Sequence, residues 1–232
     1  MLAPRNKLWS TPAAAVDIAL RFADLGIDDI VYDVGCGDGR VLIQMAALSV
    51  PLPQHTSAHS DSTPHLDMPH PRQHHCRQFL GIEISPERAA EARRNVLRAQ
   101  QAGSIPSHVA IDIVCANALD TGAVDYAKST VVFLYLVPRG LRLIKNVVWP
   151  EGAGRDNSGD SSTVPRSSPP SREETPTMPP TSTVVTGIGT QHRARRIITY
   201  MAPFENTPYI RKECCQVPHQ IGAAWPVYLY RI

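Results

Sequence analysis

The sequence predicts an α/β fold, a doubly wound and mainly parallel seven-stranded sheet with an antiparallel strand pair at its carboxyl end. Three observations lead to this prediction. An apolar, β-branched strand pattern at 30–34 runs into a loop with glycine at every second position, and an amphipathic helical pattern follows at 39–48. Strand and helix patterns then alternate, which favours parallel strands joined by right-handed crossovers. The carboxyl-terminal stretch offers two strand patterns without a helical pattern between them.

Four helices are expected, at about residues 12–25, 39–48, 86–101 and 141–149. Thr11 is the expected N-cap of the first helix, with Pro12 at the first helical position, and Gly26 is expected to end it. Ser85 and Pro86 provide the same kind of start for the third helix. These signals place one helix before the first strand and others after the first, second and fourth strands.

Seven strands are expected, at about residues 30–34, 77–84, 108–116, 129–137, 196–201, 209–217 and 225–231. The run at 129–137 is almost continuously apolar, which is typical of a central parallel strand covered on both faces. The first strand, the glycine loop and the helix after it form the opening unit of a Rossmann-like, nucleotide-binding domain.

The chain has 232 residues, enough for one domain that carries insertions. Twelve of its 21 prolines fall in two stretches with few large apolar residues. We therefore expect a single domain over 11–232 with two low-complexity, disordered insertions, at 49–76 and 151–193. Six of the nine histidines lie in the first insertion, but their spacing fits no metal-binding motif, so no metal site is predicted.

Charge and composition exclude several classes of function. A formal net charge of +2 indicates neither nucleic-acid binding nor an acidic partner. Five cysteines without a C-x-x-C spacing are typical of reduced thiols in an intracellular protein. No apolar run is long enough to span a membrane, and no secretory core is visible near the amino terminus. A monomer in the cytoplasm is expected, with the mitochondrion as the alternative compartment.

The predicted site lies beyond the carboxyl ends of the strands, where open α/β sheets bind their ligands. Glu83 ends the second strand, where a carboxylate can accept hydrogen bonds from both hydroxyls of an adenosine ribose. It lies 44 residues after Gly39, and removing the 28 residues of the first insertion leaves 16, near the usual spacing of about 20. After the third strand, the amide of Asn117 could accept from an adenine amino group, with Ile84 and Ala118 as apolar walls.

The glycine loop distinguishes between adenosine cofactors. A dinucleotide loop has the pattern G-x-G-x-x-G, whereas this chain has Gly35, Gly37 and Gly39 followed by Arg40. The loop also carries the carboxylates of Asp33 and Asp38, which would repel a diphosphate and favour a cationic amino-acid group. A sulfonium that bears an ammonium group therefore fits this loop better than a phosphate.

Three motifs resemble motifs one to three of the class I, seven-strand S-adenosylmethionine-dependent methyltransferases. They are Asp33-Val34-Gly35-Cys36-Gly37-Asp38-Gly39, Gly81-Ile82-Glu83-Ile84 and Asn117-Ala118-Leu119. More narrowly, the first motif, the strand at 130–138 and the strand at 196–200 resemble a small group that includes the ATP synthase c-subunit lysine methyltransferases. The chain departs from the class at Asn117, where aspartate is commoner, and it lacks the membrane segment of some c-subunit enzymes.

The resemblance implies S-adenosyl-L-methionine as the cofactor. Its methionine part would lie along the glycine loop with its ammonium group near Asp33, the ribose would bind Glu83, and the adenine would meet Asn117. The cofactor-binding set is then Asp33, Gly35, Cys36, Gly37, Asp38, Gly39, Glu83, Ile84, Asn117, Ala118 and Leu134.

The resemblance also implies a lysine side chain of a protein as the methyl acceptor, with Tyr135 as the candidate catalytic residue that orients the amine. Residues 134–138 lack the Asn/Asp-Pro-Pro-Tyr motif that relatives use for nucleobase amino groups, which argues against a nucleic-acid substrate. Two alternatives remain open: a catalytically weak scaffold or assembly factor with the same fold, and a nicotinamide-dependent oxidoreductase, which Arg40 disfavours.

Overall fold

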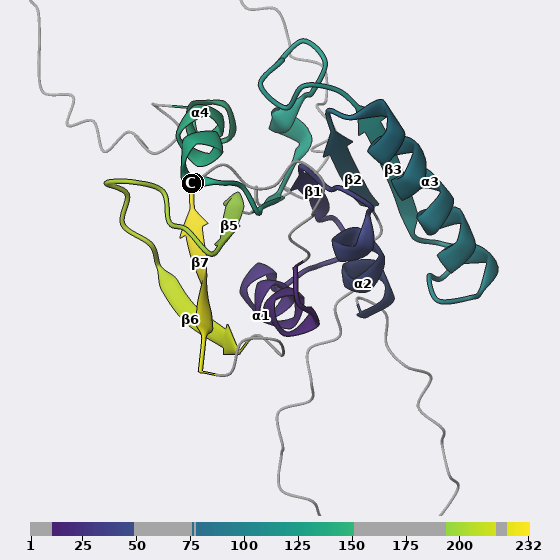
Figure 1. The fold of residues 1–232 in the computed structure, drawn as a ribbon, viewed down its shortest axis with the longest axis horizontal. Helices are drawn as coiled ribbons and strands as arrows, with labels where there is room; N and C mark the ends of the chain where they lie inside the picture. The colour runs from purple at the N-terminus through teal and green to yellow at the C-terminus, as the bar shows by residue number, and fades with distance from the viewer. Residues whose placement is uncertain (1–10, 49–75, 77, 151–193, 217–221) are drawn as a thin grey trace, which may run out of the picture.

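In a computed structural model of the chain, the described residues are 11–48, 76, 78–150, 194–216 and 222–232. Seven strands form one sheet (Figure 1), in the order β3 (Ala110–Cys115), β2 (Gln78–Glu83), β1 (Ile30–Val34), β4 (Val131–Leu134), β5 (Arg196–Tyr200), β7 (Ala224–Arg231) and β6 (Arg211–Gln216). Strands β1 to β5 pair in parallel, whereas β7 is antiparallel to both β5 and β6. The predicted fold class, with its antiparallel pair at the carboxyl end, is confirmed.

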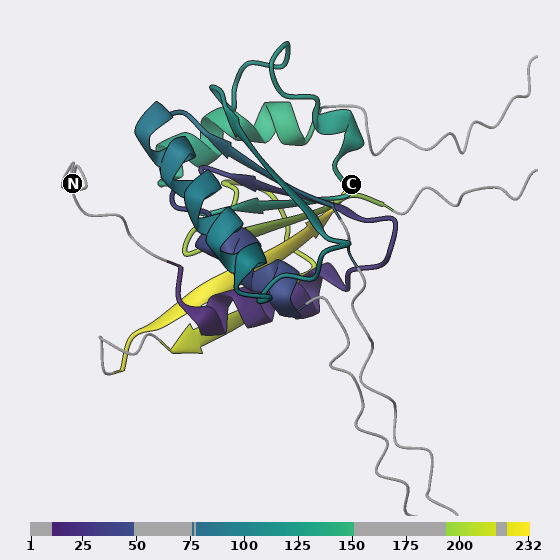
Figure 2. The same ribbon diagram turned by 90° about the vertical axis from the view of Figure 1, so that its right-hand side faces the viewer.

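Helices cover both faces of the sheet. On one face lie α1 (Ala13–Ala23), α2 (Arg40–Leu48) and α3 (Pro86–Gln101), and on the other lies α4 (Pro138–Val148). Figure 1 shows α4 on the opposite side of the sheet from α1 and α2, and Figure 2 shows α3 lying across the strands in the view at right angles. Each helix turns a stripe of apolar side chains towards the strands, as the helical periodicity predicts.

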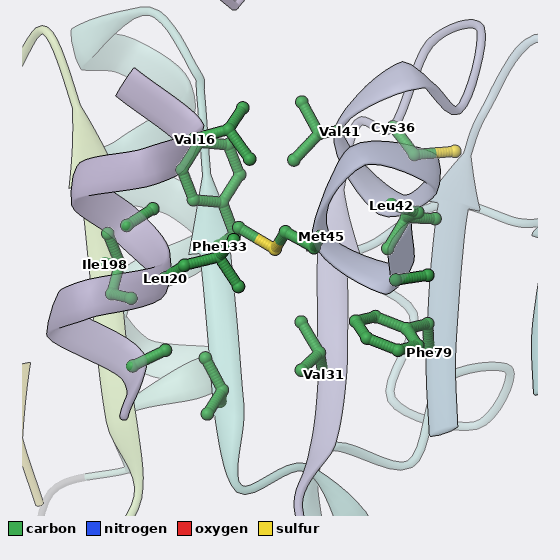
Figure 3. Packing of buried hydrophobic residues seen from close by; sticks show 14 of the residues in the cluster. Val16, Leu20, Val31, Cys36, Val41, Leu42, Met45, Phe79, Phe133 and Ile198 are labelled. Atoms are coloured by element: carbon green, nitrogen blue, oxygen red, sulfur yellow. The ribbon is translucent and has the colours of Figure 1, made fainter. Parts of the chain in front are cut away.

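The core between the sheet and α1 and α2 is close-packed (Figure 3). Met45 of α2 points towards Phe133 of β4, and Val16 and Leu20 of α1 approach from the other side. All four side chains are at most 4% exposed. Burying a side chain of this size contributes about 1.5–3 kcal/mol, so this layer fixes α2, and with it the glycine loop, against the sheet.

Both ends of α1 differ from the prediction. The amide N–H groups of Ala15 and Val16 donate to the carbonyl of Pro12, which makes Pro12 the N-cap and leaves Thr11 outside the helix. At the other end the helix stops at Asp24, whose φ of 45° is left-handed, two residues before Gly26. Ser85, by contrast, caps α3 as predicted, its Oγ accepting from the N–H of Arg88.

Strand β4 is shorter than the predicted 129–137. It ends at Leu134. Pro138, which was expected only to end the strand, instead lies in the first turn of α4. Proline suits this position because the first helical N–H groups have no partner inside the helix. Residues 135–137 therefore form a short connection from β4 to α4 at the carboxyl edge of the sheet, the edge where β1, β2 and β4 end.

A buried ion pair holds the opposite, amino edge, where these strands begin. Arg196, at the start of β5, is 2% exposed and pairs with the carboxylate of Asp29 just before β1. The guanidinium also donates to the carbonyl oxygen of Ala23 at the end of α1. Asp29 in turn accepts from the hydroxyl of Thr130 at 2.7 Å and from the N–H of Gly26 at 2.6 Å. This cluster joins α1, β1, β4 and β5.

The two expected insertions join the described part of the fold at this amino edge. The range 151–193 lies outside the described residues, and so does 49–76 except for Cys76. Cys76 is buried, and its thiol donates to the carbonyl of Asp29 at 3.0 Å. Within the described ranges, no helix combines the length and apolar character needed to cross a membrane.

Candidate active site

The glycine loop between β1 and α2 requires its alternating glycines. Gly35, Gly37 and Gly39 have φ angles of 78°, 58° and 80°, all in the left-handed region that other residues rarely adopt. At Gly39 a Cβ atom would also lie 3.3 Å from the Cβ of Ala92 on α3. The loop is therefore a tight series of turns pressed against α3.

Most N–H groups of the loop already have acceptors inside the protein. The donors and their acceptors are Gly35 and Cys36 to the carbonyl of Ile82, Gly37 to Oε2 of Glu83, Gly39 to the carbonyl of Cys36, and Arg40 to Oδ1 of Asp38. Loops that bind phosphate instead aim free N–H groups at the anion. This geometry disfavours a dinucleotide and with it the nicotinamide-dependent alternative.

Gly81 lets the loop lie directly on β2. A Cβ atom at this position would lie 2.7 Å from Sγ of Cys36 and from Cδ1 of Ile113, and 2.8 Å from Cδ1 of Leu42. No three side chains of the core can move aside together at low cost, because interiors are close-packed. The absence of a side chain at Gly81 therefore allows β2 to pack closely against the glycine loop.

Glu83 ties the end of β2 to the glycine loop. Its carboxylate is 7% exposed, and Oε2 accepts from the N–H of Gly37 at 3.0 Å while Oε1 accepts from the N–H of Ser85 at 3.0 Å. Each carboxylate oxygen has a second lone pair, so both remain able to accept from a further donor. The side chain is thus fixed by the backbone and still able to bind a diol.

Asp33 is a buried carboxylate at the end of β1. It is 3% exposed, and its Oδ2 has no hydrogen-bond partner within the part of the chain that the structure describes. Burial, together with the nearby charges of Glu83 and Asp38, raises the pKa of Asp33 to about 7. A buried carboxylate oxygen without a hydrogen-bond partner is costly, and a cationic ligand group would relieve that cost.

Asp38, the second loop carboxylate, differs from Asp33 in its contacts. Its two oxygens accept from Nε of Arg40 at 2.9 Å, and its Oδ2 also accepts from Nη2. Burial would raise the pKa of Asp38, but the hydrogen bonds and charge of Arg40 outweigh this and lower it. Of the two loop carboxylates, Asp38 is therefore already paired, whereas Asp33 has a buried oxygen without a hydrogen-bond partner among the described residues.

Two pockets open at the carboxyl edge. The first, which we call the loop pocket, is lined by Thr11, Asp33, Gly35, Cys36, Gly37, Asp38, Arg40, Val41, Phe133 and Tyr135. The second, the apolar pocket, is lined by Val34, Gly35, Ile82, Glu83, Ile84, Ala116, Asn117, Ala118, Leu119, Leu136, Gly140, Leu143 and Ile144. Gly35 lines both pockets, so the two spaces adjoin at the glycine loop.

Nine of the eleven cofactor-binding residues expected from the sequence line one of these pockets. The two that do not are Gly39, which shapes the loop, and Leu134, which is fully buried in β4. Its neighbour Leu136 lines the apolar pocket in its place. Sequence reasoning also missed Thr11 and Arg40 as pocket residues; the position of Arg40 directly after the last glycine was the available signal.

Asn117 lines the apolar pocket, but its side chain also stabilises its own loop. Oδ1 accepts from the N–H of Leu119 at 3.1 Å, an arrangement typical of an Asx turn. One lone pair of this oxygen remains for an adenine amino group. Across the same pocket, the exposed side chain of Ile84 and the partly buried Ala118 provide apolar contacts.

Tyr135 lies in the connection from β4 to α4, at the wall of the loop pocket. Its ring packs edge-on against Tyr200 of β5, with the ring centroids 4.8 Å apart. Burial raises the pKa of the Tyr135 hydroxyl to about 12, so it stays protonated at neutral pH. The side chain can orient a ligand amine through its hydroxyl or ring, but it is not poised to act as a base.

Comparison with known proteins agrees with this architecture. No family model matches the chain. A protein-lysine N-methyltransferase from Saccharolobus islandicus (strain REY15A) is 28% identical over 135 residues, which cover 58% of this chain and 63% of that protein. The match therefore spans less than two thirds of the relative's length.

Solved structures extend the comparison to the whole chain. An RNA methyltransferase from Salinibacter ruber, in complex with S-adenosyl-L-homocysteine, superposes with a TM-score of 0.53 over 96% of this chain and 93% of that chain, at 18% identity. The chain has the class I methyltransferase fold. The rRNA methyltransferase AviRa from Streptomyces viridochromogenes aligns over 99% and 88% of the two chains, with a TM-score of 0.49 and 13% identity.

In this methyltransferase fold, the two pockets lie beside β1, where the order of the strands reverses. The chain runs from β1 outward to β3 on one side and from β4 outward on the other. Such a switch point is where open α/β sheets bind ligands, because the loops on its two sides diverge. The glycine loop, Glu83 and Tyr135 all lie there.

Proposed function

We propose that the protein is an S-adenosylmethionine-dependent methyltransferase that methylates a lysine side chain of a protein. The observation that carries the proposal is the buried Oδ2 of Asp33, a residue that lines the loop pocket, because this oxygen has no hydrogen-bond partner among the described residues and a cationic ligand group would supply one. The name of the S. islandicus relative supports the lysine substrate, and the fold supports the class of reaction.

The residues of both pockets fit this cofactor. The apolar pocket would hold the adenine between Ile84 and Ala118, and Glu83 would accept hydrogen bonds from the ribose. The methionine part would then enter the loop pocket at Gly35, which lines both spaces. There the ammonium group would meet Asp33, the one polar group of the site with an unsatisfied buried oxygen in the described residues.

The bound cofactor would supply a methyl group activated on a sulfonium: an amine would attack the methyl carbon in line, and the C–S bond would break to release S-adenosylhomocysteine. The protein must then align a neutral amine and exclude water. Tyr135 lies at the pocket wall, where its hydroxyl oxygen would accept a hydrogen bond from that amine and leave the nitrogen lone pair free to attack. The ring of Tyr200 packs against the ring of Tyr135 and would hold it in place, which makes Tyr200 a positioning residue.

A nucleobase acceptor has less support. The connection at 135–137 holds tyrosine, leucine and valine, none of which offers an amide to a base amino group. The similarity to RNA methyltransferases is below 20% identity and concerns the fold alone. The substrate of those proteins is therefore not transferred to this chain.

The acceptor can be identified by incubating the purified protein with a cell extract and methyl-labelled S-adenosylmethionine, followed by mass spectrometry of the labelled band. We expect methyl-lysine in a protein. Tyr135→Phe should bind S-adenosylhomocysteine with unchanged affinity and transfer methyl groups about tenfold more slowly or worse. Label in RNA would contradict the lysine substrate, and cofactor binding without any labelled acceptor would support the scaffold alternative.

Cofactor binding should depend on pH through Asp33. With a pKa near 7 in the ligand-free protein, only the ionised fraction attracts the ammonium group. The affinity for S-adenosylhomocysteine, measured by calorimetry, should therefore rise up to about eightfold from pH 6 to pH 7.5. The affinity for 5′-methylthioadenosine, which lacks the ammonium group, should not change with pH, and Asp33→Asn should remove the pH dependence of S-adenosylhomocysteine binding.

The same raised pKa has the opposite consequence for the ligand-free protein. The folded state keeps a proton on Asp33 that the unfolded chain loses near pH 4, so the folded state binds more protons between about pH 4 and pH 7. The free energy of unfolding should fall as the pH rises through this window.

For the binding prediction, a pH-independent affinity for S-adenosylhomocysteine would show that Asp33 does not contact the ammonium group.

A further inference from the structure

We propose that the hydroxyl of Thr11 is a second acceptor for the lysine amine, so that Thr11 and Tyr135 together hold both N–H groups of the amine and leave its lone pair free to attack. This assignment rests on the proposed function, because it concerns the acceptor side of the same site. Both residues line the loop pocket. A neutral amine carries two N–H groups and one lone pair, so two acceptors fix its orientation where one acceptor leaves it free to rotate.

The direction of α1 brings Thr11 to the carboxyl edge of the sheet. Ala23, at the end of this helix, accepts from Arg196 at the amino edge. Because the helix has 11 residues, its start lies roughly 16 Å from its end, and Thr11 therefore reaches the loop pocket. Gln44 of α2 holds this start in place, since its Nε2 donates to the carbonyl of Ala13 at 3.2 Å.

The hydroxyl of Thr11 is available to a ligand. The sequence predicted this residue as the N-cap of α1, but Pro12 has that position and no side chain caps the helix. Within the described ranges, the Thr11 hydroxyl makes no hydrogen bond, and the residue is partly exposed. Its removal should therefore leave α1 intact.

The other polar side chains of the loop pocket have partners or a different role. Asp38 and Arg40 pair with each other. Asp33 is proposed for the ammonium group of the cofactor. Burial raises the pKa of the Cys36 thiol, which stays protonated and forms only weak hydrogen bonds. Among the described residues that line this pocket, the two hydroxyls are the polar side-chain groups that remain for the acceptor.

Hydroxyl acceptors suit the charge that develops during methyl transfer. As the C–N bond forms and the C–S bond breaks, the bonding electrons leave with the sulfur and the nitrogen becomes positively charged. Its N–H groups then donate more strongly, so both hydrogen bonds stabilise the transition state more than the bound amine. After the nitrogen releases one proton to water, a monomethylated amine keeps one N–H group, and a dimethylated amine keeps none.

Thr11→Val tests the assignment, because valine keeps the shape of threonine and lacks the hydroxyl. The purified protein is incubated with a cell extract and methyl-labelled S-adenosylmethionine, and the extract protein is hydrolysed and analysed for mono-, di- and trimethyl-lysine. Transfer of the first methyl group should slow about tenfold, as expected for one lost hydrogen bond, and the affinity for S-adenosylhomocysteine should stay within about twofold of the wild type. Later transfers should slow less, because they involve fewer N–H groups. At equal total label, the variant should therefore give a larger share of di- and trimethyl-lysine than the wild type.

Two variants provide controls. Thr11→Ser keeps the hydroxyl and should transfer methyl groups within about threefold of the wild-type rate. Thr121→Val removes an exposed hydroxyl that lines neither pocket, and it should change the rate by less than about twofold.

The results separate this assignment from the proposed function. An unchanged rate in Thr11→Val would overturn the assignment while the proposed function stands. So would a slower rate with unchanged proportions of the three methyl-lysines, because a purely structural defect slows every transfer alike. A wild-type protein that labels no lysine would overturn the proposed function and the assignment together.

Discussion

Replacing Arg196 with methionine should lower the free energy of unfolding by about 3–5 kcal/mol. The guanidinium is buried and pairs with Asp29, and it also donates to main-chain carbonyls at the end of α1. Its removal would leave the Asp29 carboxylate without its cation in a site from which water is excluded. For a chain of this size, the midpoint of thermal unfolding should fall by roughly 10 °C.

The matched control is Arg21→Met on α1. Arg21 also pairs with a carboxylate, that of Glu213 on β6, but the two side chains are 53% and 32% exposed. Exposed pairs contribute only about 0–1 kcal/mol, so this variant should unfold nearly as the wild type does. If urea titration gave both variants the same loss, the buried pair would have no special role in joining α1, β1 and β5.

Replacing Glu83 with alanine should weaken binding of S-adenosylhomocysteine by about a hundredfold, or 2.7 kcal/mol. The change would remove the acceptors for the ribose hydroxyls and, at the same time, the acceptors for the N–H groups of Gly37 and Ser85. Glu83→Gln keeps the size and one acceptor oxygen, so its loss should be nearer tenfold. Isothermal titration calorimetry measures both.

Glu87→Ala provides the control for charge. Glu87 lies in the first turn of α3 and is exposed, and its carboxylate accepts from the hydroxyl of Ser85 without reaching either pocket. Cofactor affinity should stay within about twofold of the wild type. Wild-type affinity in a folded Glu83→Ala variant would remove Glu83 from the proposed ribose site.

Local signals in the sequence were sufficient for most of the fold. The Ser85-Pro86 start of α3 depends on a hydroxyl and a fixed φ angle within one turn, and it is confirmed. The start of α1 was placed one residue too early, because proline is typical of the first helical position, whereas here the carbonyl of Pro12 accepts the first helical N–H groups. Similarly, two strands were expected in the tail, but only pairing across the sheet inserts β7 between β5 and β6.

The candidate site, like the fold, could be predicted from the sequence only in part. The spacing of Glu83 from the glycines, corrected for the first insertion, predicted a residue that the structure brings to the loop, since its carboxylate accepts from Gly37. The roles of Asp33 and Asp38 could not be separated from sequence, because both are carboxylates of one loop. Their difference arises from side-chain contacts: Asp33 has a buried oxygen without a hydrogen-bond partner among the described residues, whereas Asp38 is paired with Arg40.

The attachment of both expected insertions at the amino edge has a practical consequence. Leu48, Cys76, Val148 and Arg196 lie on the side of the sheet where strands begin, while both pockets open where strands end. A strand of five residues separates these sides by roughly 17 Å. A fluorophore or affinity tag joined to the described part of the fold through Leu48 or Val148 would therefore be anchored about one strand length from both pockets.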